Sequence, residues 1–183
     1  MEHRTKRQHS PDRSRHRLDP LDRLRAYPGG VGEAGGNDSD RVRFWTPPEW
    51  LIPWISRAHV AVYRLSRGRV GGRVDGMPCI LLRTTGRRSG RRHTVCLSYL
   101  PDGDSMVVVA SFGGADHHPA WYHNVVANPE VIVQNRERVF TATAETLTGI
   151  EREAVWEARI AGAPRYAHYQ ERTDREIPLV RLS

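Results

Sequence analysis

The sequence has few cysteines and no long apolar run, which argues against a metal site built on cysteines and against a membrane-spanning protein. No stretch approaches the ~20 consecutive apolar residues of a membrane-spanning helix, and the N-terminus lacks the apolar segment of a secretory signal. The two cysteines, Cys79 and Cys96, lie apart in strand-like runs without the spacing of a metal site. We therefore expect a reduced, cytoplasmic protein without a metal, in which both cysteines are small core residues.

Lysine is almost absent, because Lys6 is the only lysine among 28 basic residues. A GC-rich genome can produce this arginine bias without selection for a polyanionic partner. The net charge of +7 is also uneven: residues 44–92 hold ten basic and two acidic groups, whereas residues 93–183 hold eight and twelve. Such a local field suits one anionic ligand or surface. We expect no nucleic acid, since the basic stretch lacks the interleaved aromatic residues of a single-strand binding platform.

The length of 183 residues and the hydrophobic content of 38% suit one domain with one core. Residues 1–43 are rich in Arg, His, Ser, Asp, Pro and Gly and have few large apolar groups, so we expect a disordered tail. The folded domain is expected over residues 44–183.

The stretch from Arg83 to Arg92, which reads RTTGRRSGRR, is the most distinctive local feature. Its two glycines allow tight turns, and its five arginines match phosphate or carboxylate oxygens in a bidentate manner. The stretch is therefore either an anion-binding loop or a solvated hairpin that keeps a sheet edge soluble.

A helix is predicted before this loop, with Thr46 and Glu49 as a capping box and Pro53 delaying or kinking its start. Apolar residues recur at helical spacing and form one stripe: Leu51, Trp54, Ile55, Ala58, Val62 and Leu65. A stripe of this kind more often packs on a core. The alternative is a peripheral membrane contact through residues 45–67.

Strand-like periodicity begins near Pro78, and short turns join successive strands in an antiparallel meander. The expected strands are 80–85, 93–100, 106–111, 130–135, 139–147 and 177–182, and the expected later helices are 118–127 and 148–161. About six strands with attached helices predict a small α+β protein built on a β-barrel.

The order of four motifs resembles the deazaflavin-dependent nitroreductase family over roughly three quarters of the chain, from Pro47 to Leu182. The motifs are LRTTGRRSG (82–90), VAS (109–111) with the glycines after it, PAWYHN (119–124) running to ANP (127–129), and YxxY (166–169) with TDREIP (173–178). The resemblance implies an FMN-binding split-barrel-like fold, and an enzyme that uses the reduced 5-deazaflavin coenzyme F420. FMN itself is a less favoured cofactor.

The resemblance also implies a set of coenzyme-binding residues. The arginine stretch would bind the phosphodiester and glutamate tail, while the later motifs would form the pocket of the flat ring. The implied residues are Arg83, Thr85, Gly86, Arg87, Arg88, Ser89, Gly90, Ala110, Ser111, Pro119, Trp121, Tyr122 and Asn124. Tyr99 is a further candidate for the ring pocket, and core packing is the alternative role for Trp121 and Tyr122.

The implied reaction is hydride transfer to a quinone-like, nitroaromatic or related electrophilic acceptor. Ser111, Tyr166 and Tyr169 would hold or protonate this acceptor, although the tyrosine pair could instead be a buried hydroxyl network. Three residues depart from the family pattern: Arg88 stands where lysine is common, Cys96 replaces a frequent proline, and Ala163 replaces a tyrosine of some members. These departures leave the physiological acceptor open.

A non-catalytic carrier of F420 or FMN would need the same pocket, so the sequence does not separate it from an enzyme. We also expect that the protein can form a homodimer, as split barrels commonly do.

Overall fold

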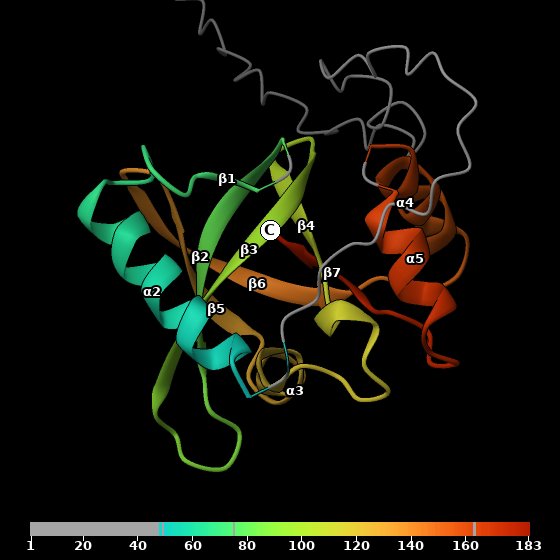
Figure 1. Cartoon of the computed structure of the whole chain (residues 1–183), viewed down its shortest axis with the longest axis horizontal. Coiled ribbons are helices and arrows are strands. Elements are labelled where there is room, and N and C mark those ends of the chain that lie inside the picture. The colour runs from blue at the N-terminus through green and yellow to red at the C-terminus, as the bar shows by residue number, and fades with distance from the viewer. Residues whose placement is uncertain (1–47, 49, 75, 163) are drawn as a thin grey trace, which may run out of the picture.

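The computed structural model describes residues 48, 50–74, 76–162 and 164–183. The expected tail, Thr46 and Glu49 lie outside the described residues. Within them, seven strands form one antiparallel sheet in the order β1-β2-β3-β4-β7-β6-β5 (Figure 1). Their bounds are β1 Arg73–Val74, β2 Met77–Thr85, β3 Arg92–Asp102, β4 Ser105–Val109, β5 Glu130–Asn135, β6 Arg138–Thr146 and β7 Leu179–Leu182.

The sheet closes into a barrel because β2 pairs with β5 as well as with β3. Leu82, for example, is the register partner of Val95 in β3 and of Val133 in β5. The six strands other than β1 thus form a continuous ring, and the predicted α+β barrel of about six antiparallel strands is confirmed. The two-residue strand β1, which the sequence did not indicate, extends the sheet beside β2.

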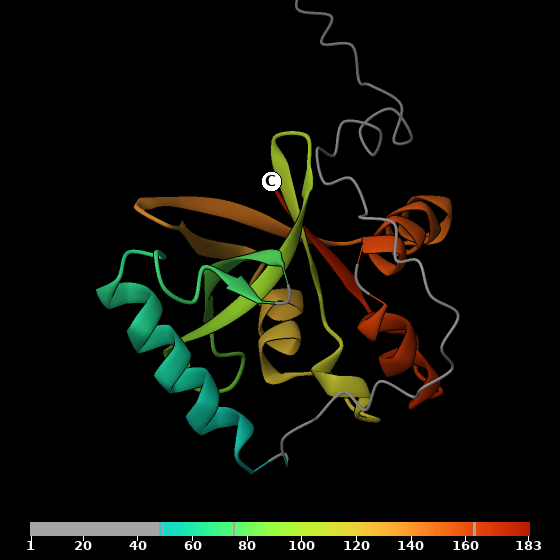
Figure 2. The same ribbon diagram turned by 45° about the horizontal axis from the view of Figure 1, so that its top comes forward.

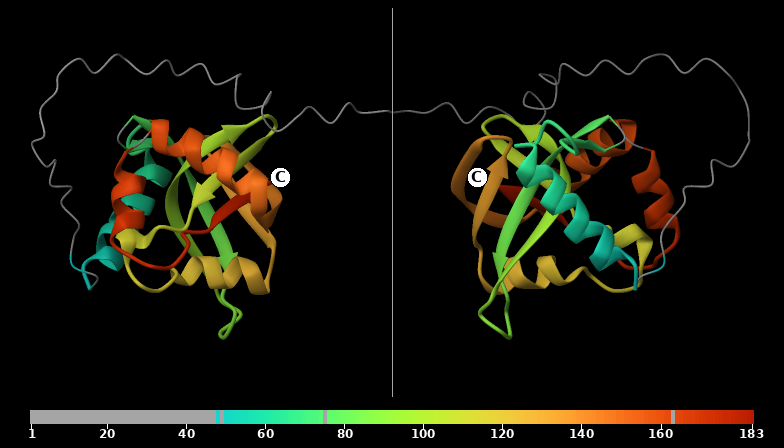
Figure 3. Two further views of the ribbon diagram at one scale, coloured as in Figure 1. Left: turned by 90° about the vertical axis from the view of Figure 1, so that its right-hand side faces the viewer. Right: turned by 60° about the vertical axis from the view of Figure 1, so that its left-hand side comes forward.

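Side chains that alternate along the strands fill the inside of this ring. The buried cluster comprises Ile80, Leu82, Val108, Ala110, Trp121, Val125, Val131, Val133, Ala142, Val180 and Leu182. Trp121 and Val125 in this cluster come from helix α3 (Ala120–Ala127), so that helix closes one end of the barrel. Figure 3 shows the hairpin between β2 and β3 projecting at the same end.

The remaining helices cover two flanks. Helix α2 (Ile52–Leu65) contacts β3, whereas α4 (Gly149–Gly162) and α5 (Arg165–Glu171) lie on the opposite flank with the short helix η1 (Phe112–Gly114) beside α5. Figure 2 shows this separation of α2 from α4 and α5. Leu147, Val155, Trp156, Tyr166 and Ile177 form a second buried cluster, which packs α4 and α5 against the sheet.

Helix α2 buries a different face from the one that its sequence indicates. Trp54, Val62 and Leu65, of the predicted stripe, are 63%, 42% and 88% exposed. The helix is anchored instead by Val60 and the fully buried Tyr63, whose hydroxyl donates to the carbonyl of Cys79 and accepts from the N–H of Arg136. The expectation that the stripe packs on the core is therefore wrong, because these two tertiary hydrogen bonds fix the rotation of the helix.

Helix α2 begins at Ile52, and its N-cap residue Leu51 makes no side-chain cap hydrogen bond, so the start lies later than the capping box predicted. A proline occupies the first turn, which agrees with the delayed start expected from Pro53. Among the described residues, no helix has the length and apolar character needed to cross a membrane.

Candidate active site

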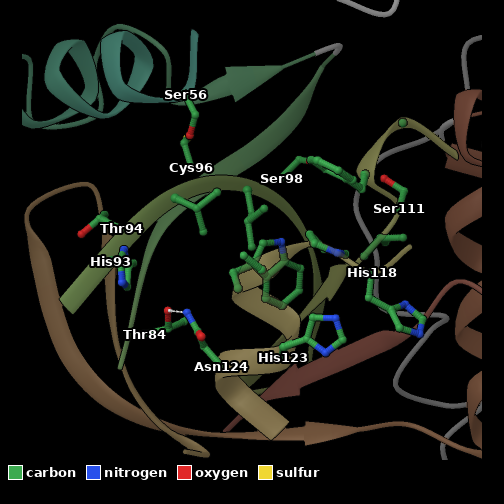
Figure 4. A pocket seen from close by; sticks show the side chains of 18 of the residues that line it. Ser56, Thr84, His93, Thr94, Cys96, Ser98, Ser111, His118, His123 and Asn124 are labelled. Carbon is green, nitrogen blue, oxygen red and sulfur yellow. Dashed lines mark hydrogen bonds between the residues drawn. The ribbon is translucent and has the colours of Figure 1, made fainter. Parts of the chain in front are cut away.

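A cavity of about 1010 Å³ opens between α2, β3, η1, α3 and α5 (Figure 4). Ligand pockets commonly measure about 300 to 1,000 Å³, so this one has room for a large ligand. Predicted site residues that line it are Gly86, Arg87, Arg88, Ser89, Ser111, Pro119, Trp121, Asn124, Tyr166 and Tyr169. The fold thus brings together four motifs that are far apart in the sequence.

The arginine hairpin forms the basic end of the cavity. The N–H of Gly86 donates to the carbonyl of Arg91 at 2.8 Å, and the N–H of Gly90 donates to the carbonyl of Gly86 at 2.8 Å. The N–H groups of Gly86 and Gly90 are thus already hydrogen-bonded within the hairpin and are not offered to an anion. The guanidinium groups of Arg87 and Arg88, which are exposed and line the cavity, are the strongest groups there for binding an anion.

A buried polar network fixes this hairpin against α3. Asn124 is 7% exposed, and its Oδ1 accepts from the N–H of Arg87 at 3.1 Å. Its Nδ2 donates to the hydroxyl of Thr84 at 3.1 Å, and this contact is drawn in Figure 4. Asn124 therefore positions the basic end in addition to lining it.

Five predicted coenzyme residues do not line the cavity: Arg83, Thr85, Gly90, Ala110 and Tyr122. Arg83 is exposed whereas Thr84 is buried, because neighbouring side chains of a strand point to opposite faces. Tyr122 packs on the barrel cluster, and its hydroxyl accepts from Thr146 at 3.4 Å. Tyr99 likewise lies elsewhere, on a second cavity, where its hydroxyl accepts from Asn135 at 3.2 Å.

Ser111 lies at the start of η1, directly after β4 and Ala110. It is 9% exposed. The next residue, Phe112, has a φ of 48°, a left-handed conformation that is unfavourable for a bulky side chain. Arg175 holds this turn, since its Nη2 donates to the carbonyl of Ser111 at 2.7 Å.

Hydroxyl groups gather at the far end of the cavity. Tyr166 and Tyr169 share one face of α5, and their ring centroids are 6.0 Å apart. The hydroxyl of Tyr166 lies 2.8 Å from Oγ of Ser98, which comes from β3. Tyr166 thus forms a hydroxyl pair and also lines the cavity, and both alternatives for the two tyrosines stay predictions.

Two histidines at the cavity wall have lowered pKa values. Burial is the main cause of the lowered pKa of His118, followed by the charge of Arg175, and burial also lowers the pKa of His123, followed by the charge of Arg87. Both imidazoles are thus biased towards the neutral form. Figure 4 places His118 on the same side of the pocket as Ser111.

The two cysteines behave differently from one another. Cys79 is buried and Cys96 is half-buried, and both line the cavity. The Sγ of Cys96 lies 3.6 Å from Nε2 of His59. A hydrogen bond with Cys79, followed by burial, raises the pKa of Cys96. Cys96 is therefore a protonated, weakly nucleophilic thiol at neutral pH.

Sequence reasoning did not identify Thr84, Ser98, His118 or Arg175 as site residues. His118 and Arg175 stand beside or within the motifs that were recognised, and this position was an available signal. No comparable signal in the sequence marked Thr84 or Ser98, because the role of each depends on which face of its strand lies towards the cavity.

The cavity has the chemistry of a site for a flat ligand with an anionic arm. Arg87 and Arg88 stand at one end, and Trp121, Val95 and Leu97 line the wall. The hydroxyl groups of Tyr166 and Tyr169 lie at the other end, together with Arg165. This arrangement can orient two molecules and donate hydrogen bonds to an oxygen that becomes negatively charged.

Comparison with known proteins identifies relatives of this chain. The family model described as F420H(2)-dependent quinone reductase matches residues 54–183. A Mycobacterium tuberculosis (strain ATCC 25618 / H37Rv) protein named F420H(2)-dependent quinone reductase is 40% identical over 133 residues, covering 70% of this chain and 89% of that protein.

Two solved structures are also similar. One is described as an F420-H2 dependent reductase; it has 42% identity and a TM-score of 0.54, and the match covers 58% of this chain and 94% of that chain. The other is described as a domain-swapped dimer; it has 37% identity and a TM-score of 0.56, and the match covers 72% of this chain and 98% of that chain.

Proposed function

Because the chain belongs to the F420H(2)-dependent quinone reductase family, we propose that it is an F420-dependent reductase acting on a quinone-like, nitroaromatic or related electrophilic acceptor. The family match over residues 54–183 carries this proposal. The resemblance noted in the sequence is to the same group of deazaflavin enzymes.

The residues present fit the coenzyme. F420 combines a flat deazaflavin ring with a phosphodiester and glutamate arm, and the cavity combines an apolar wall at Trp121 with the guanidinium groups of Arg87 and Arg88. In this assignment the two arginines bind the phosphate or the tail, and Asn124 fixes the hairpin that carries them. Trp121 and Pro119 contact the ring.

When bound, reduced F420 supplies a hydride, and this hydride with one proton converts a quinone to a hydroquinone. The protein's part is orientation, exclusion of water and hydrogen bonding where charge develops. Ser111, Tyr166 and Tyr169 hold the acceptor, and a tyrosine hydroxyl delivers the proton. Ser98 orients Tyr166 through the 2.8 Å contact between their oxygens.

The test is to mix the purified protein with reduced F420 and menadione and to follow reoxidation of the coenzyme by absorbance. NADPH and reduced FMN serve as controls for cofactor choice. We expect F420-dependent turnover. Failure to bind F420 would remove the proposal, and binding without reoxidation would favour the second candidate, a non-catalytic F420 carrier that uses the same pocket.

A peripheral membrane contact is a further part of the proposal. It is supported by the exposed apolar face of α2, where Trp54, Val62 and Leu65 stand beside Arg57 and Arg64. We expect the protein to sediment with vesicles that contain an anionic lipid, and Leu65→Asp to reduce this binding. Equal sedimentation of the wild type with neutral and anionic vesicles would contradict the role of the arginines.

We also propose that the protein forms a homodimer, on the basis of the similar structure described as a domain-swapped dimer. Sedimentation equilibrium of the full chain checks this, and a monomer at every concentration tested would contradict it.

A further inference from the structure

Arg175 is a guanidinium group that binds main-chain carbonyls instead of a carboxylate. Its Nε donates to the carbonyl of Ala115 at 2.7 Å, and its Nη2 donates to the carbonyls of Ser111 and Ala110 at 2.7 and 3.3 Å. Its Nη1 lies 3.1 Å from Nδ1 of His118. No ion pair to Arg175 is present among the residues that the structure describes. Arg175 thus hydrogen-bonds both His118 and the turn at Ser111, and it fixes the position of the one relative to the other.

This contact determines the tautomer of His118. A guanidinium group can only donate hydrogen bonds, so Nδ1 of His118 must accept with its lone pair. The proton of the neutral ring is therefore on Nε2, directed away from Arg175. A proton on Nδ1 as well would place two donors against each other, which agrees with the lowered pKa of His118.

The surroundings of His118 leave its Nε2–H available to a molecule in the cavity. The ring centroid of His118 lies 4.9 Å from that of Tyr122 and 5.8 Å from that of His123. Within the described part of the chain, no group accepts a hydrogen bond from Nε2, although His118 lines the cavity. The charges that act on His118 are those of Arg175, His117 and His123. The titratable Tyr122 packs beside the ring, and the charge of Asp116 acts on Arg175.

We propose that His118 is a catalytic hydrogen-bond donor whose Nε2–H, fixed by Arg175, binds an oxygen of the hydride acceptor beside Ser111. This inference rests on the proposed reductase function. An acceptor oxygen gains negative charge as the hydride arrives, and a donor that is already oriented stabilises that charge without reorganisation. A neutral imidazole is a very weak acid, so His118 supplies the hydrogen bond while a hydroxyl group delivers the proton.

The first test measures the tautomer without coenzyme, by ¹⁵N NMR of protein labelled at histidine. In the wild type we expect the Nε2–H form of His118 to persist from pH 8 to below pH 6.5. In Arg175→Gln we expect a mixture of tautomers and a ring that titrates at higher pH than in the wild type. An Nδ1–H tautomer in the wild type, or the same tautomer and titration in both proteins, would overturn the proposal.

The second test separates hydrogen bonding from packing in the F420-loaded protein. His118→Phe keeps a ring against Tyr122 but has no donor, whereas His118→Gln keeps an N–H. We expect kcat to fall roughly a hundredfold in His118→Phe and much less in His118→Gln, with the Kd for F420 within about twofold of the wild type in both. Equal kcat values for His118→Phe and the wild type, or a parallel loss of F420 affinity, would overturn the proposal.

Menadione binding distinguishes a failure of this inference from a failure of the proposed function. If the wild type binds F420 and menadione without turnover, the reductase function fails, whereas a shift of the His118 Nε2 resonance on adding menadione still supports the contact. Uniformly ¹⁵N-labelled protein supplies the matching backbone amide signals. No shift of the His118 Nε2 resonance at saturating menadione, while the amide resonances of Ser111 or Tyr166 do shift, would overturn the contact.

Discussion

The hydroxyl oxygens of Ser98 and Tyr166 lie 2.8 Å apart and join strand β3 to helix α5 across the cavity. A hydroxyl that has a partner at this distance is held in one rotamer, so Ser98 restricts the direction in which Tyr166 can donate. The pair therefore couples the barrel to the element that carries both tyrosines.

Replacing Ser98 tests this coupling. We expect Ser98→Ala to lower kcat by a few-fold, Tyr166→Phe to lower it more, and the double variant to resemble Tyr166→Phe if Ser98 acts on the reaction through Tyr166. Steady-state kinetics of the four proteins forms a double-mutant cycle. Strictly additive effects would show that the two hydroxyl groups act independently.

Arg88 and Arg83 are a matched pair for the anion site, since Arg88 lines the cavity and Arg83 does not. A charge-assisted contact contributes about 1.5 to 3 kcal/mol, so Arg88→Ala should weaken F420 binding roughly 10- to 100-fold. Arg83→Ala should change the Kd by less than about threefold, as expected for a screened charge. Titration of F420 followed by its fluorescence checks both, and equal losses would place Arg83 in the binding site as well.

Gly114 allows η1 to approach α5 closely. Its φ is 80°, and a Cβ at this position would lie 2.6 Å from the carbonyl oxygen of Tyr169. We expect Gly114→Ala to lower the free energy of unfolding by about 2 to 4 kcal/mol, and to raise the KM for the acceptor because Tyr169 must move.

Gly103→Ala is the control for this substitution, since its φ is 60° but nothing lies within 4 Å of the added Cβ. The control should cost only about 1 kcal/mol of strain and leave the KM unchanged. Urea unfolding and kinetics measure the two effects. Comparable destabilisation by both alanines would mean that the contact with Tyr169 relaxes freely.

The histidines at the cavity wall predict a pH dependence of stability. The folded protein holds the pKa of His118 and His123 below the ordinary value of 6.5. Below pH 6.5 the unfolded chain therefore binds protons that the folded protein does not, and the free energy of unfolding falls as the pH falls. Urea unfolding between pH 8 and pH 5.5 measures this slope.

His118→Phe should make the slope shallower, while Tyr122→Phe, which changes a neighbouring ring without removing an imidazole, should leave it unchanged. A wild-type stability that does not vary below pH 6.5 would contradict the assignment.

The sequence was informative where a role depends on neighbours along the chain. The strand at 130–135 was predicted with the observed bounds, because its residues alternate in a local pattern. Trp121 and Asn124 were predicted as pocket residues from their motif, and both line the cavity. That they bind the coenzyme stays a prediction.

The differences from the sequence-based expectations at β2 and at α2 share one physical origin, which is the rotation of each element about its own axis. A register shift of β2 by one residue would place the side chain of Arg83 inside the barrel and that of Thr84 outside it. The observed register is fixed by the pairing of β2 with both β3 and β5. Helix α2 buries Val60 and Tyr63 in place of the more apolar stripe because the hydroxyl of Tyr63 finds partners at Cys79 and Arg136. Those partners lie 16 and 73 residues away, beyond the range of periodicity.

The position of β7 determines when the barrel can fold during synthesis of the chain. Strand β7 pairs with both β4 and β6, and the N–H of Ala110 donates to the carbonyl of Pro178. The barrel therefore lacks one of its strands and stays open until residues 179–182 have left the ribosome. A nascent chain that stops before Leu179 exposes two open strand edges, which is an aggregation hazard. We therefore expect the cell to obtain this binding pocket only after translation of the barrel is finished, and early termination to produce insoluble fragments.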